Sequence, residues 1–122
     1  MEQMLAYRPM NRVLFPVLLL LATASFASDA AKVDVDVALE AGKVHEACER
    51  LEKGDRRRYH WKATAPVDFN IHYHRGKDVV FPVRRDGMRG DGGTFVAKSA
   101  EDYCWMWTAR KAPAKVTGQV LK

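Results

Sequence analysis

The chain has 122 residues, which allows one domain at most and excludes a multidomain architecture. Its formal net charge is +5, from 20 lysines and arginines against 15 aspartates and glutamates. A basic balance of this kind would suggest nucleic acid binding in a cytoplasmic protein, whereas in an exported protein it indicates solubility or contact with anionic envelope surfaces.

The first 27 residues have the pattern of a secretory signal peptide. Arg8 and Arg12 form a charged start, residues 13–22 form an apolar run, and small residues follow. The run is shorter than the ~20 residues that span a bilayer, so we expect a signal peptide helix that is cleaved, with Ser25 and Ala27 before the cut. An uncleaved anchor is the alternative. No cysteine ends the run, which argues against a lipoprotein.

Cleavage after Ala27 would leave residues 28–122 as a single domain in the periplasm or outside the cell. Neither a transmembrane anchor nor a nucleic acid partner is then expected. Both cysteines, Cys48 and Cys104, remain in this domain. Because an exported protein meets an oxidising compartment, we expect a disulfide between them. It would close a loop of roughly 57 residues and stabilise the fold by about 4 kcal/mol. Two buried free thiols are the alternative.

Short alternating segments separated by turn residues predict an all-β, antiparallel domain. Strands are expected at residues 32–37, 59–63, 67–76, 79–83, 94–97, 103–108 and 115–121. The segment 38–53 stays open between helix and strand, because its composition favours a helix and Gly42 interrupts it. Pro82 cannot donate a ladder hydrogen bond, so its strand should lie at an edge or a bulge. Residues 84–93 are rich in glycine and charge, and predict a long mobile loop.

The segment 67–76 is the central strand of this prediction. Phe69, Ile71 and Tyr73 point to one side, which should be core, and the intervening polar residues should face water. Two of these polar residues, His72 and His74, lie about 7 Å apart along the backbone. With His60 from a neighbouring strand, they could bind copper or zinc. An ordinary solvent-exposed sheet face, with no cofactor, is the alternative.

The order and spacing of several segments resemble the GOLD (Golgi dynamics) domain, the lumenal β-sandwich of eukaryotic cargo receptors. The matching segments are Cys-Glu-Arg-Leu-Glu-Lys-Gly-Asp at 48–55, the strand and turn at 67–76, Gly-Thr-Phe at 93–95 and Tyr-Cys-Trp-Met-Trp at 103–107. The resemblance covers residues 48–121. It implies an antiparallel, jelly-roll-like β-sandwich that serves as a binding or adaptor module, with no catalytic residues to inherit. The helical stalk of the receptors is missing, so a trafficking role is not implied.

Aromatic and basic residues supply two further candidate surfaces. Tyr103, Trp105 and Trp107 share one strand face, which predicts either the sandwich core or a platform for a sugar or apolar ligand. Arginines gather in two expected loops, at residues 56–58 and at Arg84, Arg85 and Arg89. Several arginines in one loop could bind an anionic group or a partner protein, because the guanidinium fork fits carboxylate and phosphate. Simple solvation of these loops is the alternative.

Catalytic motifs are not evident, since Ser28 and Ser99 lie outside any nucleophile motif. We therefore expect an exported, non-catalytic binding or adaptor module of the cell envelope, with an unknown protein or envelope component as its partner. Two alternatives remain open. One is a periplasmic copper- or zinc-binding protein that uses the His-x-His strand. The other is an envelope inhibitor or stress factor that acts through the basic loops.

Overall fold

The computed structural model describes residues 32–122, which form six β-strands and no helix. The strands are β1 (Lys32–Leu39), β2 (Val44–Leu51), β3 (Arg56–Arg75), β4 (Asp78–Val96), β5 (Glu101–Ala109) and β6 (Ala114–Leu121). The predicted all-β class is confirmed. The expected signal peptide at 1–27 lies outside the described residues. Within the described part, no helix long and apolar enough to cross a membrane is present.

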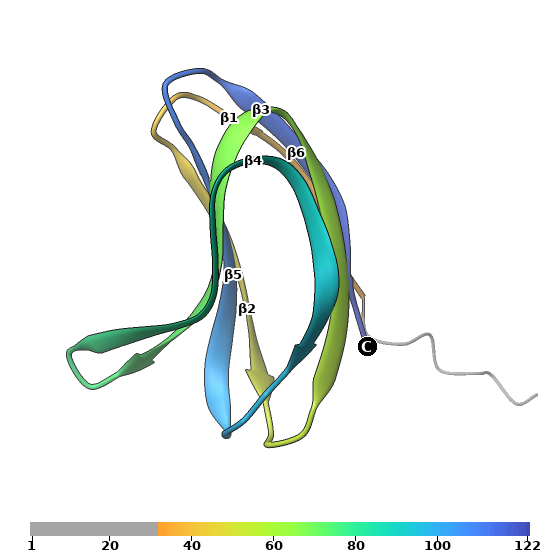
Figure 1. Ribbon diagram of the computed structural model, residues 1–122, viewed down its shortest axis with the longest axis vertical. Helices are drawn as coiled ribbons and strands as arrows, with labels where there is room; N and C mark the ends of the chain where they lie inside the picture. Colours follow the sequence, from red (N-terminus) through yellow and green to blue (C-terminus); the bar gives the residue numbers. More distant parts are fainter. Residues whose placement is uncertain (1–31) are drawn as a thin grey trace, which may run out of the picture.

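The long strand β3 connects the two layers of the fold. Along one edge it pairs with β4. Along the other edge its first half pairs with β6 and its second half pairs with β5. Strands β1 and β2 then add to β6 and β5, so that one antiparallel sheet folds over on itself. Figure 1 shows β3 and β4 arching together from one layer to the other, with their hairpin projecting from the body.

The strands expected at residues 59–63 and 67–76 are one continuous strand, β3, which bends between them. Pro66 lies where the β3–β4 register shifts between Lys62 and Val67, and the chain continues as one strand on both sides. A proline at such an irregularity omits one ladder hydrogen bond without ending the strand. The bend is what allows a single 20-residue strand to serve both layers.

The glycine-rich segment 84–93 is part of strand β4, so its prediction as a mobile loop was wrong. A Cβ on Gly90 would lie 3.0 Å from the Trp61 carbonyl oxygen, and one on Gly92 would lie 3.2 Å from the Tyr59 carbonyl oxygen. These glycines therefore permit a close approach of β4 to β3. Gly87, with φ of 65°, forms a bulge whose N–H donates to Asp68 Oδ1 at 2.8 Å.

Two further local predictions concern the segment 38–53 and Pro82. Segment 38–53 is strand rather than helix, because β1 and β2 flank a turn at Gly42, where φ is 76°. The position of Pro82 is confirmed. Strand β4 pairs only with β3, and Pro82 falls at the register shift opposite Ile71 and Tyr73.

The core lies between the two layers and is built from aromatic side chains. The ring of Phe69 lies 5.3–5.4 Å from the rings of Tyr59, Trp61 and Trp107. Trp105 and Trp107 are each 1% exposed, as is Tyr103. Burial on this scale is the main stabilising contribution in so small a domain. The aromatic strand is therefore core, and Trp105 and Trp107 are too buried to form a ligand platform.

Candidate functional site

A recess opens on the outer face of strands β2, β5, β3 and β4, beside the disulfide. It has a volume of about 320 Å³. Its lining residues are Glu46, His72, His74, Val79, Phe81 and Met106. We call it the His72 recess. The strand register explains its composition, because Met106 of β5 lies between Glu46 of β2 and Asn70 of β3.

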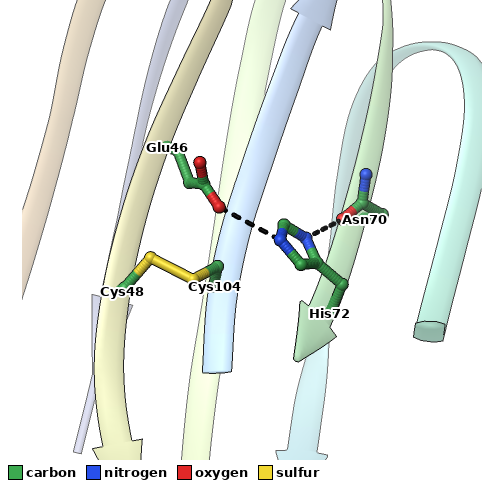
Figure 2. Close-up of a disulfide and its surroundings, with 5 residues drawn as sticks. All are labelled: Glu46, Cys48, Asn70, His72 and Cys104. Atoms are coloured by element: carbon green, nitrogen blue, oxygen red, sulfur yellow. Dashed lines mark hydrogen bonds and ion pairs between the residues drawn. A yellow bond between two sulfur atoms is a disulfide. The ribbon is translucent and has the colours of Figure 1, made fainter. Parts of the chain in front are cut away.

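His72 is the buried centre of this recess, with 4% of its surface exposed. Its Nδ1–H donates to Asn70 Oδ1 at 2.7 Å, and its Nε2 lies 3.0 Å from Glu46 Oε1 (Figure 2). Phe81 packs near the imidazole, at 5.8 Å between ring centroids. The prediction that the polar residues of this strand all face water was therefore wrong, because Asn70 and His72 are buried. Side chains from β2 and β4 cover this part of the outer face.

Cys48 and Cys104 form a disulfide between directly opposed positions of β2 and β5. The next residue in the same row is His72, which pairs in register with Cys104. As a result, ligand atoms of Glu46, His72 and Cys104 all lie within 4.8 Å of one another. The expected disulfide is thus present, and it lies beside the His72 imidazole.

The three expected histidines do not converge. His74 stands edge-on to His72, with 5.4 Å between ring centroids, and its side chain is exposed. His60, however, pairs in register with Gly92 and Gln119 in the other layer. Because His60 belongs to the same strand as His72, twelve residues earlier, it cannot come from a neighbouring strand. The assignment of His60 to this metal site is therefore corrected.

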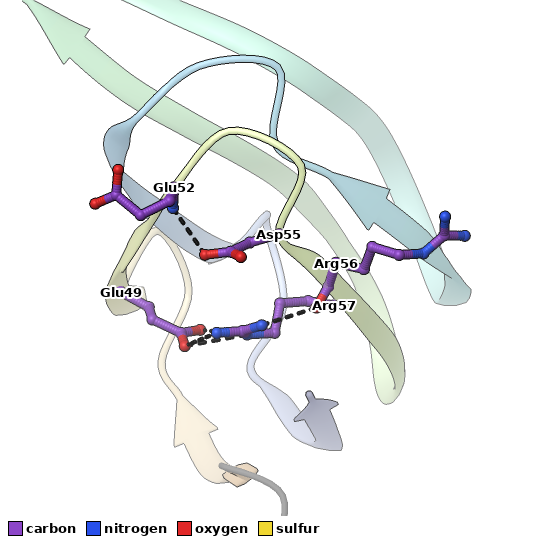
Figure 3. A network of polar contacts seen from close by, with 5 residues as sticks. All are labelled: Glu49, Glu52, Asp55, Arg56 and Arg57. Atoms are coloured by element: carbon purple, nitrogen blue, oxygen red, sulfur yellow. Dashed lines mark hydrogen bonds and ion pairs between the residues drawn. The ribbon is translucent and has the colours of Figure 1, made fainter.

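Glu49 and Arg57 join the two layers at one end of the sandwich. The Arg57 Nε–H lies 3.0 Å from both carboxylate oxygens of Glu49, and Nη2 also donates to this carboxylate (Figure 3). The Glu49 hydrogen bonds, opposed by burial, raise the pKa of Arg57 above its usual value. Residues 56–58 were expected in a basic loop. They begin β3 instead, and Arg57 is buried in an ion pair.

Arg84, Arg85 and Arg89 also lie on a strand, because the expected loop is part of β4. Arg84 lies over the ring of Phe81 and pairs weakly with Asp86, at 3.7 Å. Arg85 Nε is 3.9 Å from Asp91 Oδ2, and Arg89 donates to the Thr64 carbonyl at 3.1 Å. All three side chains are exposed, so their charges remain open to a partner.

A second, apolar pocket was not predicted from the sequence. It has a volume of about 460 Å³ and lies between the two ends of β4. Its lining residues are Tyr73, Val80, Pro82, Thr94, Phe95, Val96, Lys98, Ser99 and Tyr103. Strand β4 also carries three exposed large hydrophobic side chains, Val79, Phe81 and Val96. The sequence pattern around these residues is that of an ordinary strand. Their exposure follows from the position of β4 at the edge of the sheet.

Comparison with solved structures shows the fold. The chain is similar to PliG of Aeromonas hydrophila, described as a periplasmic lysozyme inhibitor of g-type lysozyme, with a TM-score of 0.56 and 12% identity. The similarity covers 79% of this chain and 90% of PliG. A de novo designed double-stranded β-helix is less similar, with a TM-score of 0.41, 15% identity, and coverage of 72% of this chain and 97% of the design.

No family model and no curated protein sequence matches the chain. The resemblance to the GOLD domain is therefore unsupported by a family model, and what is established is the β-rich fold shared with PliG. At this level of identity the similarity concerns the fold alone.

Proposed function

We propose that this chain is an exported, non-catalytic inhibitor that binds a cell-wall hydrolase of the lysozyme class. The observation that carries the proposal is the surface of β4. This edge strand holds three of the four exposed large hydrophobic side chains of residues 32–122, beside an apolar pocket. Exposed apolar side chains on an edge strand are typical of protein interaction sites. The fold shared with PliG makes a lysozyme the first partner to test.

The charges along β4 suit this kind of partner. Glycoside hydrolases of the lysozyme type use carboxylates in their active sites, and arginine pairs well with a carboxylate. Arg84 and Arg85 make ion pairs of 3.7 and 3.9 Å at the surface. The Arg84–Asp86 pair, whose side chains are 65% and 56% exposed, should contribute about 0–1 kcal/mol, so an enzyme carboxylate could replace Asp86 at little cost.

Export fits the same proposal. The disulfide between Cys48 and Cys104 is expected in an oxidising compartment. A periplasmic or secreted location would also place the chain where cell-wall hydrolases act. The signal peptide expected at residues 1–27 would direct it there.

The test is inhibition of cell-wall lysis by a g-type lysozyme, with the exported, disulfide-bonded chain added in increasing amounts. We expect saturable inhibition and a complex in gel filtration. Changing Phe81→Ala together with Arg84→Glu and Arg85→Glu should weaken inhibition by about 100-fold or more, as for other central contacts of an interface.

A matched control keeps the charge change and moves it away from the proposed interface. Lys43→Glu with Arg50→Glu alters two exposed cations at and beside β2, the edge strand that pairs only with β5, and it should leave inhibition unchanged. Equal loss of inhibition in the control would reject β4 as the contact surface. Absence of both inhibition and complex formation with g-type and other lysozymes would reject the proposed function.

A further inference from the structure

Four potential metal ligands meet at the floor of the His72 recess. Cys48, Cys104 and His72 occupy one row across β2, β5 and β3, and Glu46 lies two residues before Cys48 on the same strand face. The ligand atoms of Glu46, His72 and Cys104 lie within 4.8 Å of one another, and Cys48 is bonded to Cys104 (Figure 2). Two cysteines, one histidine and one carboxylate are a donor set that suits zinc.

In the disulfide-bonded chain these donors are engaged with one another. The two sulfur atoms share a bond, and the Nε2 atom of His72 faces Glu46 Oε1 at hydrogen-bond distance. A thiolate, not a disulfide sulfur, is the form of cysteine that binds metal. The oxidised chain therefore withholds both sulfur ligands.

We propose that reduction of the Cys48–Cys104 disulfide converts this cluster into a binding site for one zinc-type divalent cation. The ligands would be Cys48 Sγ, Cys104 Sγ, His72 Nε2 and a carboxylate oxygen of Glu46. This proposal does not depend on the proposed inhibitory function, because it concerns another chemical state of the chain. The two sites share Val79 and Phe81, which line the His72 recess, so the metal site is tested with variants of Glu46 and His72 alone.

The reductant is a dithiol. Its thiolate attacks the Sγ of Cys48, whose side chain is exposed, and Cys104 leaves as a thiolate. The second thiol of the reductant then releases Cys48 and leaves as part of a disulfide. The two electrons and two protons supplied by the dithiol thus produce two cysteine thiols. A divalent cation then displaces one proton from each thiol and takes the place of the Glu46 contact at His72 Nε2.

The geometry requires only small movements. With metal–ligand distances of about 2.0–2.3 Å, ligand atoms around a tetrahedral ion lie roughly 3.3–3.8 Å apart. For Glu46, His72 and Cys104, the 4.8 Å limit is therefore about 1.0–1.5 Å too wide at most. Glu46 can supply that movement because its side chain is 39% exposed.

Asn70 already provides the outer support that a metal-binding histidine requires. Its Oδ1 accepts the hydrogen bond from Nδ1 of His72 at 2.7 Å, which directs Nε2 towards Glu46 and the cysteines. Such contacts hold the ring orientation and the tautomer in metal sites. The buried imidazole is thus oriented for a cation in advance.

The experiment uses cobalt(II) as a spectroscopic probe for zinc. The folded chain is reduced with dithiothreitol, desalted under argon and titrated with cobalt(II), in parallel with the oxidised chain. We expect one cobalt per reduced chain, with a thiolate-to-cobalt charge-transfer band, and no such band in the oxidised chain. Zinc should displace the cobalt stoichiometrically.

Variants distinguish this site from adventitious thiol binding. His72→Ala should weaken cobalt binding by at least about tenfold. Glu46→Gln, at a half-exposed position less critical to folding, should also weaken binding and shift the visible bands. His60→Ala is the matched control and should have no effect. The proposal is overturned by equal binding to the oxidised chain, by unchanged affinity in both site variants, or by loss of the β-sheet circular dichroism signal on reduction alone.

Discussion

Gly118 of β6 should not tolerate even one added methyl group. It pairs in register with Trp61 of β3, where the two strands approach closely. A Cβ at this position would lie 2.3 Å from the His60 carbonyl oxygen and 2.7 Å from the Trp61 Cα. Both are backbone atoms in the middle of a paired strand, so no side-chain rotation can relieve the clash.

The cost of Gly118→Ala follows from the required displacement. Ordinary contact begins at 3.4 Å, whereas the added Cβ would lie 2.3 Å from the His60 carbonyl oxygen, so the two backbones must separate by about 1 Å. That separation weakens the β3–β6 hydrogen bonds and loosens packing around Trp61. Overpacking costs typically about 1–3 kcal/mol, and rigid backbone places this site at the upper end, near 3 kcal/mol. For a domain of this size, the melting temperature should fall by roughly 12–24 °C.

Thermal and urea unfolding, followed by circular dichroism, would measure the change. Gly93→Ala is the control, because its Cβ would lie 3.4 Å from the Tyr59 hydroxyl, which is an ordinary contact distance. We expect the control to change stability by less than about 1 kcal/mol. If the two variants unfold at the same temperature, close backbone approach is not what Gly118 provides, and the argument fails.

Three further predictions concern the layer contact, alkaline stability and the disulfide. Arg57→Met should destabilise the fold by about 1–3 kcal/mol in urea unfolding, because it leaves the partly buried Glu49 carboxylate without its partner. Burial raises the pKa of Tyr59 above its ordinary value of 10.0, so the contribution of Tyr59 to stability should be constant below pH 10 and fall as pH rises towards the folded-state pKa; pH-dependent unfolding would measure this. Replacing Cys48 and Cys104 with alanine should cost about 4 kcal/mol in urea unfolding, in line with loss of a loop closure.

Each of these predictions has a discriminating comparison. Adding Glu49→Gln to Arg57→Met should recover part of the lost stability, and strict additivity would show that the pair is not coupled. Tyr59→Phe should flatten the stability curve above pH 10, and an unchanged curve would assign the alkaline transition to other groups. A cysteine-free variant as stable as the parent would contradict the entropic role of the disulfide.

The sequence by itself determined the class of the fold and much of its core. Period-two alternation around Phe69 and in Tyr103, Trp105 and Trp107 predicted strands, and these four side chains are indeed buried. Such alternation is a local property of the chain, because a strand directs successive side chains to opposite faces. The expected disulfide likewise depended on two cysteines in a chain with the pattern of a signal peptide, and required no tertiary information.

The tertiary structure decided the continuity of β3 and β4 and the composition of the His72 recess. Pro66 and the glycines of β4 are local breakers, yet pairing with neighbouring strands keeps both segments extended. That continuity places His60 in one layer and His72 in the other. Glu46 joins His72 only through the pairing of β2, β5 and β3. Contacts between residues distant in sequence depend on strand order and register, which no single alternating segment specifies.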